Sequence, residues 1–186
     1  ALISRDVLFG NPDRAGLQLS PDGTALAFLA PLDGVMNVWV APLEDPGAAR
    51  AVTADKGRGI QRYRWCYDNR HLLYLQDDAG NENWRLHALD LITGAVRHLS
   101  PESGVTARIE GLSPQFPGEA LVALNDRDPR FHDIHRVEIA TGKKKLVQQN
   151  DGFLGFITDD AFRVRFAARP TPTGGNALFR KNAEGT

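Results

Sequence analysis

The sequence predicts an all-β fold made of a repeated four-stranded unit, and two observations lead to this prediction. The first is an internal period: the turn after the first strand of each unit falls at Ser20, Cys66, Ser113 and Thr158, with separations of 46, 47 and 45 residues. The second is that each unit consists of four short apolar runs joined by turns, without the 3.6-residue periodicity of helices. A period in the forties built from four strands is typical of β-propeller blades. We therefore expect a partial β-propeller of about three and a half four-stranded antiparallel blades.

The bulk composition favours a soluble globular protein. The 186 residues are 42% hydrophobic and contain 22 Lys and Arg against 23 Asp and Glu. This balance gives no argument for binding nucleic acid or an anionic membrane, and no apolar run approaches the roughly 20 residues that span a bilayer. Cys66 is the single cysteine, which excludes an internal disulfide. It favours a reducing, cytoplasmic compartment and leaves a periplasmic or secreted location open.

Residues 1–16 precede the first blade, and we expect them to form a packing segment that covers one edge or face of the array. Ser4 can cap a short helix through Val7-Leu8-Phe9, and Gly10 and Pro12 would end it.

Blade one is predicted at residues 17–53, with turns at Pro21-Asp22-Gly23 and Asp33-Gly34. The linker that follows contains Gly57-Arg58-Gly59, which superficially resembles a nucleotide-binding glycine loop. Arg62 occupies the place of the third glycine and no helical pattern follows. We interpret this linker as a turn between blades.

Blades two and three are predicted at residues 63–100 and 107–148. Each has a continuous apolar run for a buried strand and a Thr-Gly turn before its outer strand, at Thr93-Gly94 and Thr141-Gly142. Residues 143–145 are three lysines on the outer strand of blade three. A basic binding patch is one interpretation, but lysines on an outermost strand more often prevent edge-to-edge pairing.

Blade four, residues 153–186, contains only three of the expected strands. Because a closed propeller needs at least four complete blades, we expect a piece of a larger protein or an open fan with exposed edges. Residues 177–181 would then be an unpaired strand edge, for which self-association or strand exchange is expected.

A search for catalytic and cofactor-binding residues gives no candidate. The Gly-x-Ser-x-Gly nucleophile elbow is absent from the sequence. His132 and His135 are ligand-type residues, but their spacing of three on a strand directs them to opposite faces, so no metal site is predicted. Cys66 falls in a turn without a Lys or His pattern that would activate its thiol.

Two arginines in the charged loop of residues 125–130 are the candidates for substrate binding. The guanidinium of Arg127 or Arg130 could bind a carboxylate at the rim or tunnel of the propeller. The alternative is structural, because Asp and Arg side chains commonly tie hairpin loops together within and between blades.

Several motifs carry a family resemblance. Ser20-Pro21-Asp22-Gly23 followed by Leu26-Ala27-Phe28 resembles the blade motif of TolB-like propellers and of prolyl oligopeptidase (S9) family serine peptidases. Residues 125–142 carry the same motif, although His135 stands where an aromatic residue is usual. The opening residues 2–12, with Asn37-Val38-Trp39-Val40 and Asn83-Trp84, are similar to the N-terminal portion of bacterial S9 peptidases of the acylaminoacyl-peptidase and dipeptidyl-peptidase type.

The resemblance implies that the full-length protein is a serine peptidase in which a propeller of seven or eight blades caps a C-terminal α/β-hydrolase domain. This chain would be about the first half of the propeller, gating the access of short peptides, and inactive alone because the hydrolase domain holds the Ser, Asp and His. The dipeptidyl-peptidase branch also uses a Glu pair, and this sequence has none. The alternative function is a TolB-like propeller that acts as a protein-interaction module.

Overall fold

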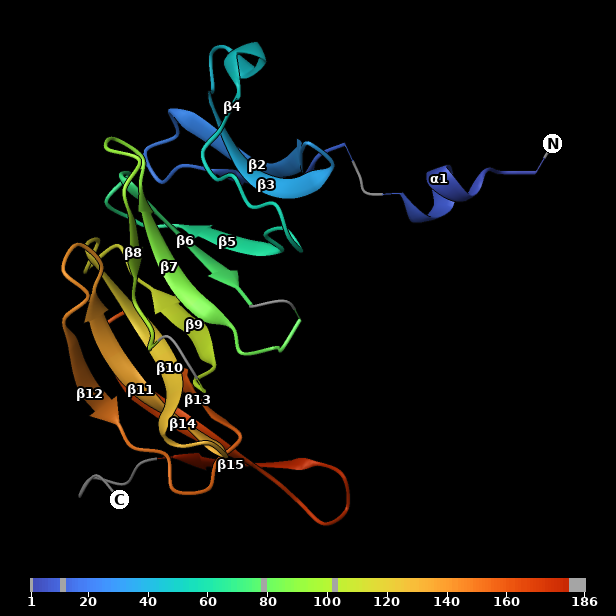
Figure 1. The fold of residues 1–186 in the computed structure, drawn as a ribbon. Helices are drawn as coiled ribbons and strands as arrows, with labels where there is room; N and C mark the ends of the chain where they lie inside the picture. Colours follow the sequence, from blue (N-terminus) through green and yellow to red (C-terminus); the bar gives the residue numbers. More distant parts are fainter. Residues whose placement is uncertain (1, 11–12, 78–79, 102–103, 181–186) are drawn as a thin grey trace.

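Four antiparallel sheets follow one another along the chain (Figure 1). The computed structural model describes residues 2–10, 13–77, 80–101 and 104–180. Over these residues, three sheets have four strands and the last has three, and the strands of each sheet lie in chain order. The prediction of a partial propeller with about three and a half blades is confirmed.

The elements have the following bounds. The first sheet contains β1 (Ala15–Leu19), β2 (Ala25–Leu32), β3 (Val35–Pro42) and β4 (Arg50–Ala51), with the 3-10 helix η1 (Pro46–Ala48) before β4. The second contains β5 (Arg62–Trp65), β6 (His71–Gln76), β7 (Arg85–Asp90) and β8 (Val96–His98). The third contains β9 (Ala107–Leu112), β10 (Glu119–Asp128), β11 (Phe131–Glu138) and β12 (Lys144–Gln148). The fourth contains β13 (Gly155–Thr158), β14 (Val164–Pro170) and β15 (Asn176–Arg180).

The turns between β1 and β2 and between β2 and β3 contain residues that favour positive φ angles. Asp33 and Gly34 have φ values of 52° and 84°, and two consecutive positive φ angles are the geometry of a type I′ hairpin turn between β2 and β3. Gly23 has a φ of 75° at the end of the turn between β1 and β2. Positive φ is accessible to glycine without the Cβ clash that penalises other residues, so local sequence determines these connections.

Apolar side chains between neighbouring blades form the core. Along β6, alternate residues point to opposite faces, so Leu72 and Tyr74 pack toward blade one while Leu73 and Leu75 pack toward blade three. The cluster between blades three and four is smaller, with Leu121, Ala123, Ile134 and Phe162 as its buried members. Burial on both faces explains why the middle strands read as continuous apolar runs.

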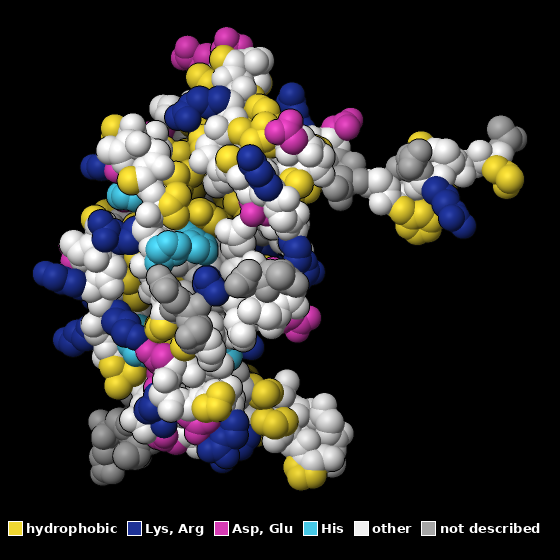
Figure 2. Space-filling view, viewed as in Figure 1, with side chains coloured by type: hydrophobic (Ala, Val, Ile, Leu, Met, Phe, Trp, Pro, Cys, Tyr) yellow, Lys and Arg dark blue, Asp and Glu magenta, His cyan; other side chains and the backbone are white. Residues whose placement is uncertain are grey.

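The N-terminal segment differs from the expected packing segment. Val7 donates its backbone N–H to the Ser4 hydroxyl at 3.4 Å, and α1 (Arg5–Phe9) forms as the sequence predicts. Residues 2–10 extend away from β1 instead of folding back over it, and Figure 2 shows their hydrophobic side chains at the surface. Phe9 is 81% exposed. In the described part of the chain, no helix is long and apolar enough to cross a membrane.

Candidate functional site

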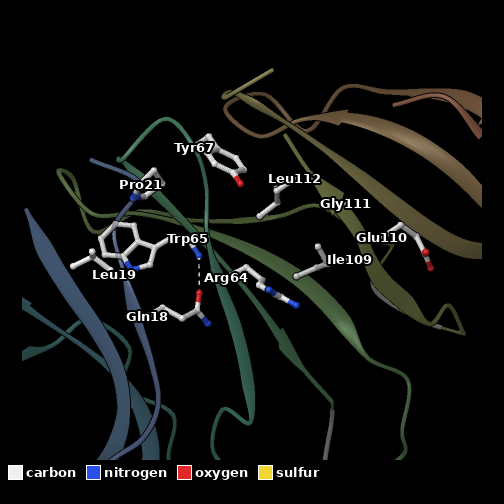
Figure 3. Close-up of a pocket in the computed structure, with 10 residues that line it drawn as sticks. All are labelled: Gln18, Leu19, Pro21, Arg64, Trp65, Tyr67, Ile109, Glu110, Gly111 and Leu112. Carbon is white, nitrogen blue, oxygen red and sulfur yellow. Dashed lines mark hydrogen bonds between the residues drawn. The ribbon is translucent and has the colours of Figure 1, made fainter. Parts of the chain in front are cut away.

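A pocket of about 430 Å³ lies where the first strands of three successive blades approach one another (Figure 3). Figure 1 shows the first strands β5 and β9 on one side of the array and the last strands β8 and β12 on the other side. We call β1, β5, β9 and β13 the inner strands. The pocket is lined by Gln18, Leu19, Pro21, Arg64, Trp65, Tyr67, Ile109, Glu110, Gly111 and Leu112.

Gln18 connects the inner strands of blades one and two. Its side-chain amide donates to the Tyr63 carbonyl at 2.9 Å, and its side-chain oxygen accepts from the backbone N–H of Trp65 at 3.4 Å, the dashed line in Figure 3. The Tyr63 hydroxyl donates to the Gly16 carbonyl at 2.6 Å. These hydrogen bonds satisfy backbone N–H and C=O groups of β1 and β5, which are edge strands of their sheets. They therefore fix the wall of the pocket that these two strands form.

Arg64 is exposed on β5, between the buried side chains of Tyr63 and Trp65. No described residue forms a hydrogen bond or an ion pair with its guanidinium. Figure 3 shows the side chain extending from β5 toward Ile109 on β9, so it lies over the middle of the pocket. A guanidinium is charged at every physiological pH, and this one is available to an anionic ligand.

Glu110, on β9, lines the pocket, but Figure 3 shows its carboxyl group directed away from Arg64. Burial raises its pKa above the ordinary value, and the nearby Arg108 partly opposes this shift. Apolar side chains of Leu19, Trp65 and Ile109 also line the pocket. The pocket therefore combines an apolar lining with the guanidinium of Arg64, a mixture that suits an apolar ligand carrying a negative charge, such as a short peptide.

The two predicted candidates lie elsewhere, on the hairpin of β10 and β11. Arg127 donates to both carboxylate oxygens of Asp133, at 2.7 and 2.9 Å, and to the Asn150 carbonyl at 2.7 Å. Arg130 donates to Asp128 at 3.0 and 2.8 Å. Residues 125–128 are also part of β10 and not of a loop, because the ladder continues past a bulge to the Asp128 and Phe131 pair. Both guanidinium groups therefore have internal partners.

The other singled-out residues occupy structural positions. His135 is buried on β11, and the described ranges contain no group of three or more His, Cys, Asp or Glu that could hold a metal ion. Burial raises the pKa of the Cys66 thiol, which keeps it protonated. Lys144 lies on the edge strand β12 and pairs with Asp126.

Comparisons with known proteins give two curated relatives. The chain is 47% identical over 185 residues to dipeptidyl aminopeptidase BIII of Pseudoxanthomonas mexicana, covering 99% of this chain and 27% of that protein. It is 30% identical over 188 residues to dipeptidyl peptidase family member 6 of Caenorhabditis elegans, covering 96% of this chain and 25% of that protein. The chain thus spans about a quarter of the length of the curated relatives it matches. No family model matches the sequence.

Solved structures share the fold. The propeller domain of the Trilobed protease from Pyrococcus furiosus matches with a TM-score of 0.63 at 18% identity, over 92% of this chain and 55% of that domain. The acylaminoacyl peptidase from Pyrococcus horikoshii matches with a TM-score of 0.61 at 18% identity, over 90% of this chain and 30% of that protein.

The arrangement of the four sheets and the pocket on their inner strands define a β-propeller domain that is incomplete within this chain. The relatives identify its family. The chain is the propeller portion of a prolyl oligopeptidase (S9) family member.

Proposed function

We propose that this chain forms part of a propeller that admits short peptides to the α/β-hydrolase domain of a longer serine peptidase. The observation that carries the proposal is the inner-strand pocket, because three blades contribute to it and its lining is both apolar and charged. A site shared by several blades restricts a ligand by size, since no single blade can move aside without disturbing the contacts of its neighbours.

The relatives support this assignment. Their names describe dipeptidyl peptidases, and each is about four times as long as the segment that aligns with this chain. The sequence of this chain has no nucleophile elbow, so we assign the acyl-enzyme chemistry to the remainder of the longer protein. The chain itself contributes walls that bind and orient a peptide and exclude larger molecules.

The test uses a substitution that narrows the pocket, and it is made in the longer protein that contains this chain. Leu19 lines the pocket and is 52% exposed, so a Leu19→Trp variant adds a larger side chain to the pocket wall. We expect kcat/KM for an octapeptide to fall several-fold more than kcat/KM for a dipeptide p-nitroanilide. Leu43→Trp is the matched control, because Leu43 is 42% exposed and lies outside the pocket lining.

Equal losses for both substrates in the Leu19→Trp variant, or no loss for either, would contradict the gating role. Fluorophosphonate labelling of the same preparations locates the reactive serine. A label on this chain, or no label on an active enzyme, would contradict the assignment of catalysis to another domain.

A further inference from the structure

The inner strands carry an excess of positive charge that the chain as a whole does not have. The described strands β1 and β13 contain no charged residue, whereas β5 contains Arg62 and Arg64. On β9, Arg108 accompanies Glu110. Three guanidinium groups therefore accompany one carboxyl group along the inner edge, in a protein with 22 basic and 23 acidic residues. This local excess favours an anionic ligand.

Among these groups, Arg64 has the position to bind such a ligand. It is two residues from Arg62, so both lie on the face of β5 opposite to Tyr63 and Trp65, but only Arg64 lines the pocket. Many other arginines are already neutralised by ion pairs within the described structure: Arg58, Arg70, Arg127, Arg130, Arg136 and Arg163. Among the described residues, no side chain or backbone group occupies the guanidinium of Arg64, so its hydrogen-bond donors are available to a ligand.

The surroundings of Arg64 favour a carboxylate attached to an apolar group. Apolar side chains of Leu19, Ile109 and Leu112 lie in the same pocket, and they reduce the water that competes with a charged hydrogen bond. The carboxyl group of Glu110 points away from the guanidinium in Figure 3, so it does not compete with an anionic ligand for Arg64.

We infer that Arg64 binds the carboxylate of a short peptide, with the apolar side chains of the peptide against the pocket lining. This inference rests on the proposed function, because it names the feature by which the propeller would select among peptides. A guanidinium can bind a carboxylate through two parallel hydrogen bonds, so an arginine at this position recognises the group by geometry as well as by charge. The carboxylate can be the C-terminus of the peptide or the side chain of Asp or Glu.

Isothermal titration calorimetry on the 186-residue chain tests this inference with the unlabelled tetrapeptide Ala-Leu-Ala-Phe, as the free acid and as the C-terminal amide. We expect the acid to bind about tenfold more tightly than the amide, in the range of a charged hydrogen bond. The Arg64→Gln variant should bind both forms equally weakly, and Arg64→Lys should retain part of the preference. A third peptide, Ala-Asp-Ala-Phe amide, distinguishes the two sources of carboxylate.

Arg97→Gln is the matched control, because it removes one exposed positive charge from the outer strand β8 of the same blade. It should keep the preference for the acid. Equal binding of the acid and both amides by the unmodified chain would overturn the inference, as would a preference that survives in Arg64→Gln. An active longer peptidase without this preference would contradict only this inference. An inactive longer protein with the preference would contradict only the proposed function.

Discussion

The guanidinium of Arg127 binds the carboxylate of Asp133 through two hydrogen bonds of 2.7 and 2.9 Å. Asp133 also accepts the backbone N–H of Asn150 at 2.7 Å, and only 3% of its side chain is exposed. Because Asn150 precedes blade four, this pair links the β10–β11 hairpin to the chain segment that enters the next blade. The role is structural, and it determines what substitution should do.

We predict that Asp133→Asn lowers the free energy of unfolding by about 1–3 kcal/mol, because an amide cannot accept both Arg127 hydrogen bonds at a buried position. Asp128→Asn is the control, since its partner Arg130 is exposed, and it should cause no measurable change. Urea denaturation of both variants measures the difference. Equal stability of the two variants would show that the Asp133 pair has no structural role.

This pair should also contribute to acid sensitivity. Hydrogen bonding to Arg127 lowers the pKa of the Asp133 carboxyl in the folded state. Its contribution to stability is therefore complete above the ordinary carboxyl pKa of about 3.9, and it is lost as the pH falls through the lower folded-state value.

A second prediction concerns His87, which stacks on Tyr74 at 4.9 Å and lies 4.9 Å from the ring of His98. Burial lowers the pKa of His87 to about 4, with the neighbouring charges of His98 and Arg85 adding to the effect. In the unfolded chain this imidazole is protonated below about pH 6.5, whereas in the folded chain it stays neutral down to about pH 4. The free energy of unfolding therefore falls as the pH falls from about 6.5 toward 4.

We expect the titration of His87 to lower the free energy of unfolding by about 2 kcal/mol between about pH 7.5 and pH 5. The His87→Phe variant keeps an aromatic ring against Tyr74 and removes the titrating group, so its stability should change less over the same interval. Urea denaturation at both pH values tests this prediction. An unchanged pH dependence in the variant would show that another group causes the acid sensitivity.

A third prediction compares two glycines with positive φ. An alanine Cβ at Gly59 would lie 2.8 Å from the Met36 carbonyl oxygen, whereas at Gly94 it would meet no atom within 4 Å. In both variants the alanine must adopt the left-handed conformation of the glycine it replaces, with φ of 80° at position 59 and 73° at position 94. Gly94→Ala should therefore lower the free energy of unfolding by about 1 kcal/mol. Gly59→Ala adds a backbone clash and should cost about 3 kcal/mol in total. Thermal unfolding of both variants measures this difference, and equal costs would contradict the clash.

A fourth prediction concerns the strand β15, which pairs with β14 on one side and has no second partner among the described strands. Leu178, on this strand, is 63% exposed. We predict that the isolated 186-residue chain self-associates with increasing concentration, and that Leu178→Lys weakens this association because a charged edge discourages pairing. Light scattering over a range of concentrations tests this prediction. Leu154→Lys is the control, because Leu154 is 57% exposed and lies outside β15. A monodisperse monomer at high concentration would refute the prediction.

The repeat and its turns were predictable because backbone conformation is encoded in neighbouring residues. Asp33-Gly34 and Pro21-Asp22-Gly23 each specify a turn without reference to the rest of the chain. The position of residues 2–10 was not predictable, since an apolar segment indicates that a partner surface is favourable and does not indicate where that surface lies.

The pocket was missed for a related reason. Arg127 and Arg130 stand out because charged residues cluster around them in the sequence, and the same cluster supplies their internal partners. Gln18 and Arg64 are single polar residues whose neighbours come from other blades. The repeat could have predicted the pocket residues. The position two residues before the turn of each blade is occupied by Gln18, Arg64 and Gly111, and all three line the pocket.

The unequal apolar clusters between blades have a consequence for amide hydrogen exchange. In an array where each unit contacts only its neighbours, a unit opens with a free energy set by the interfaces it shares. Blade two shares two large clusters, whereas blade four is held by the smaller cluster that contains Leu121 and Phe162. Amides of β14 should therefore exchange with deuterium through local opening, while those of β6 should exchange only when the whole array unfolds.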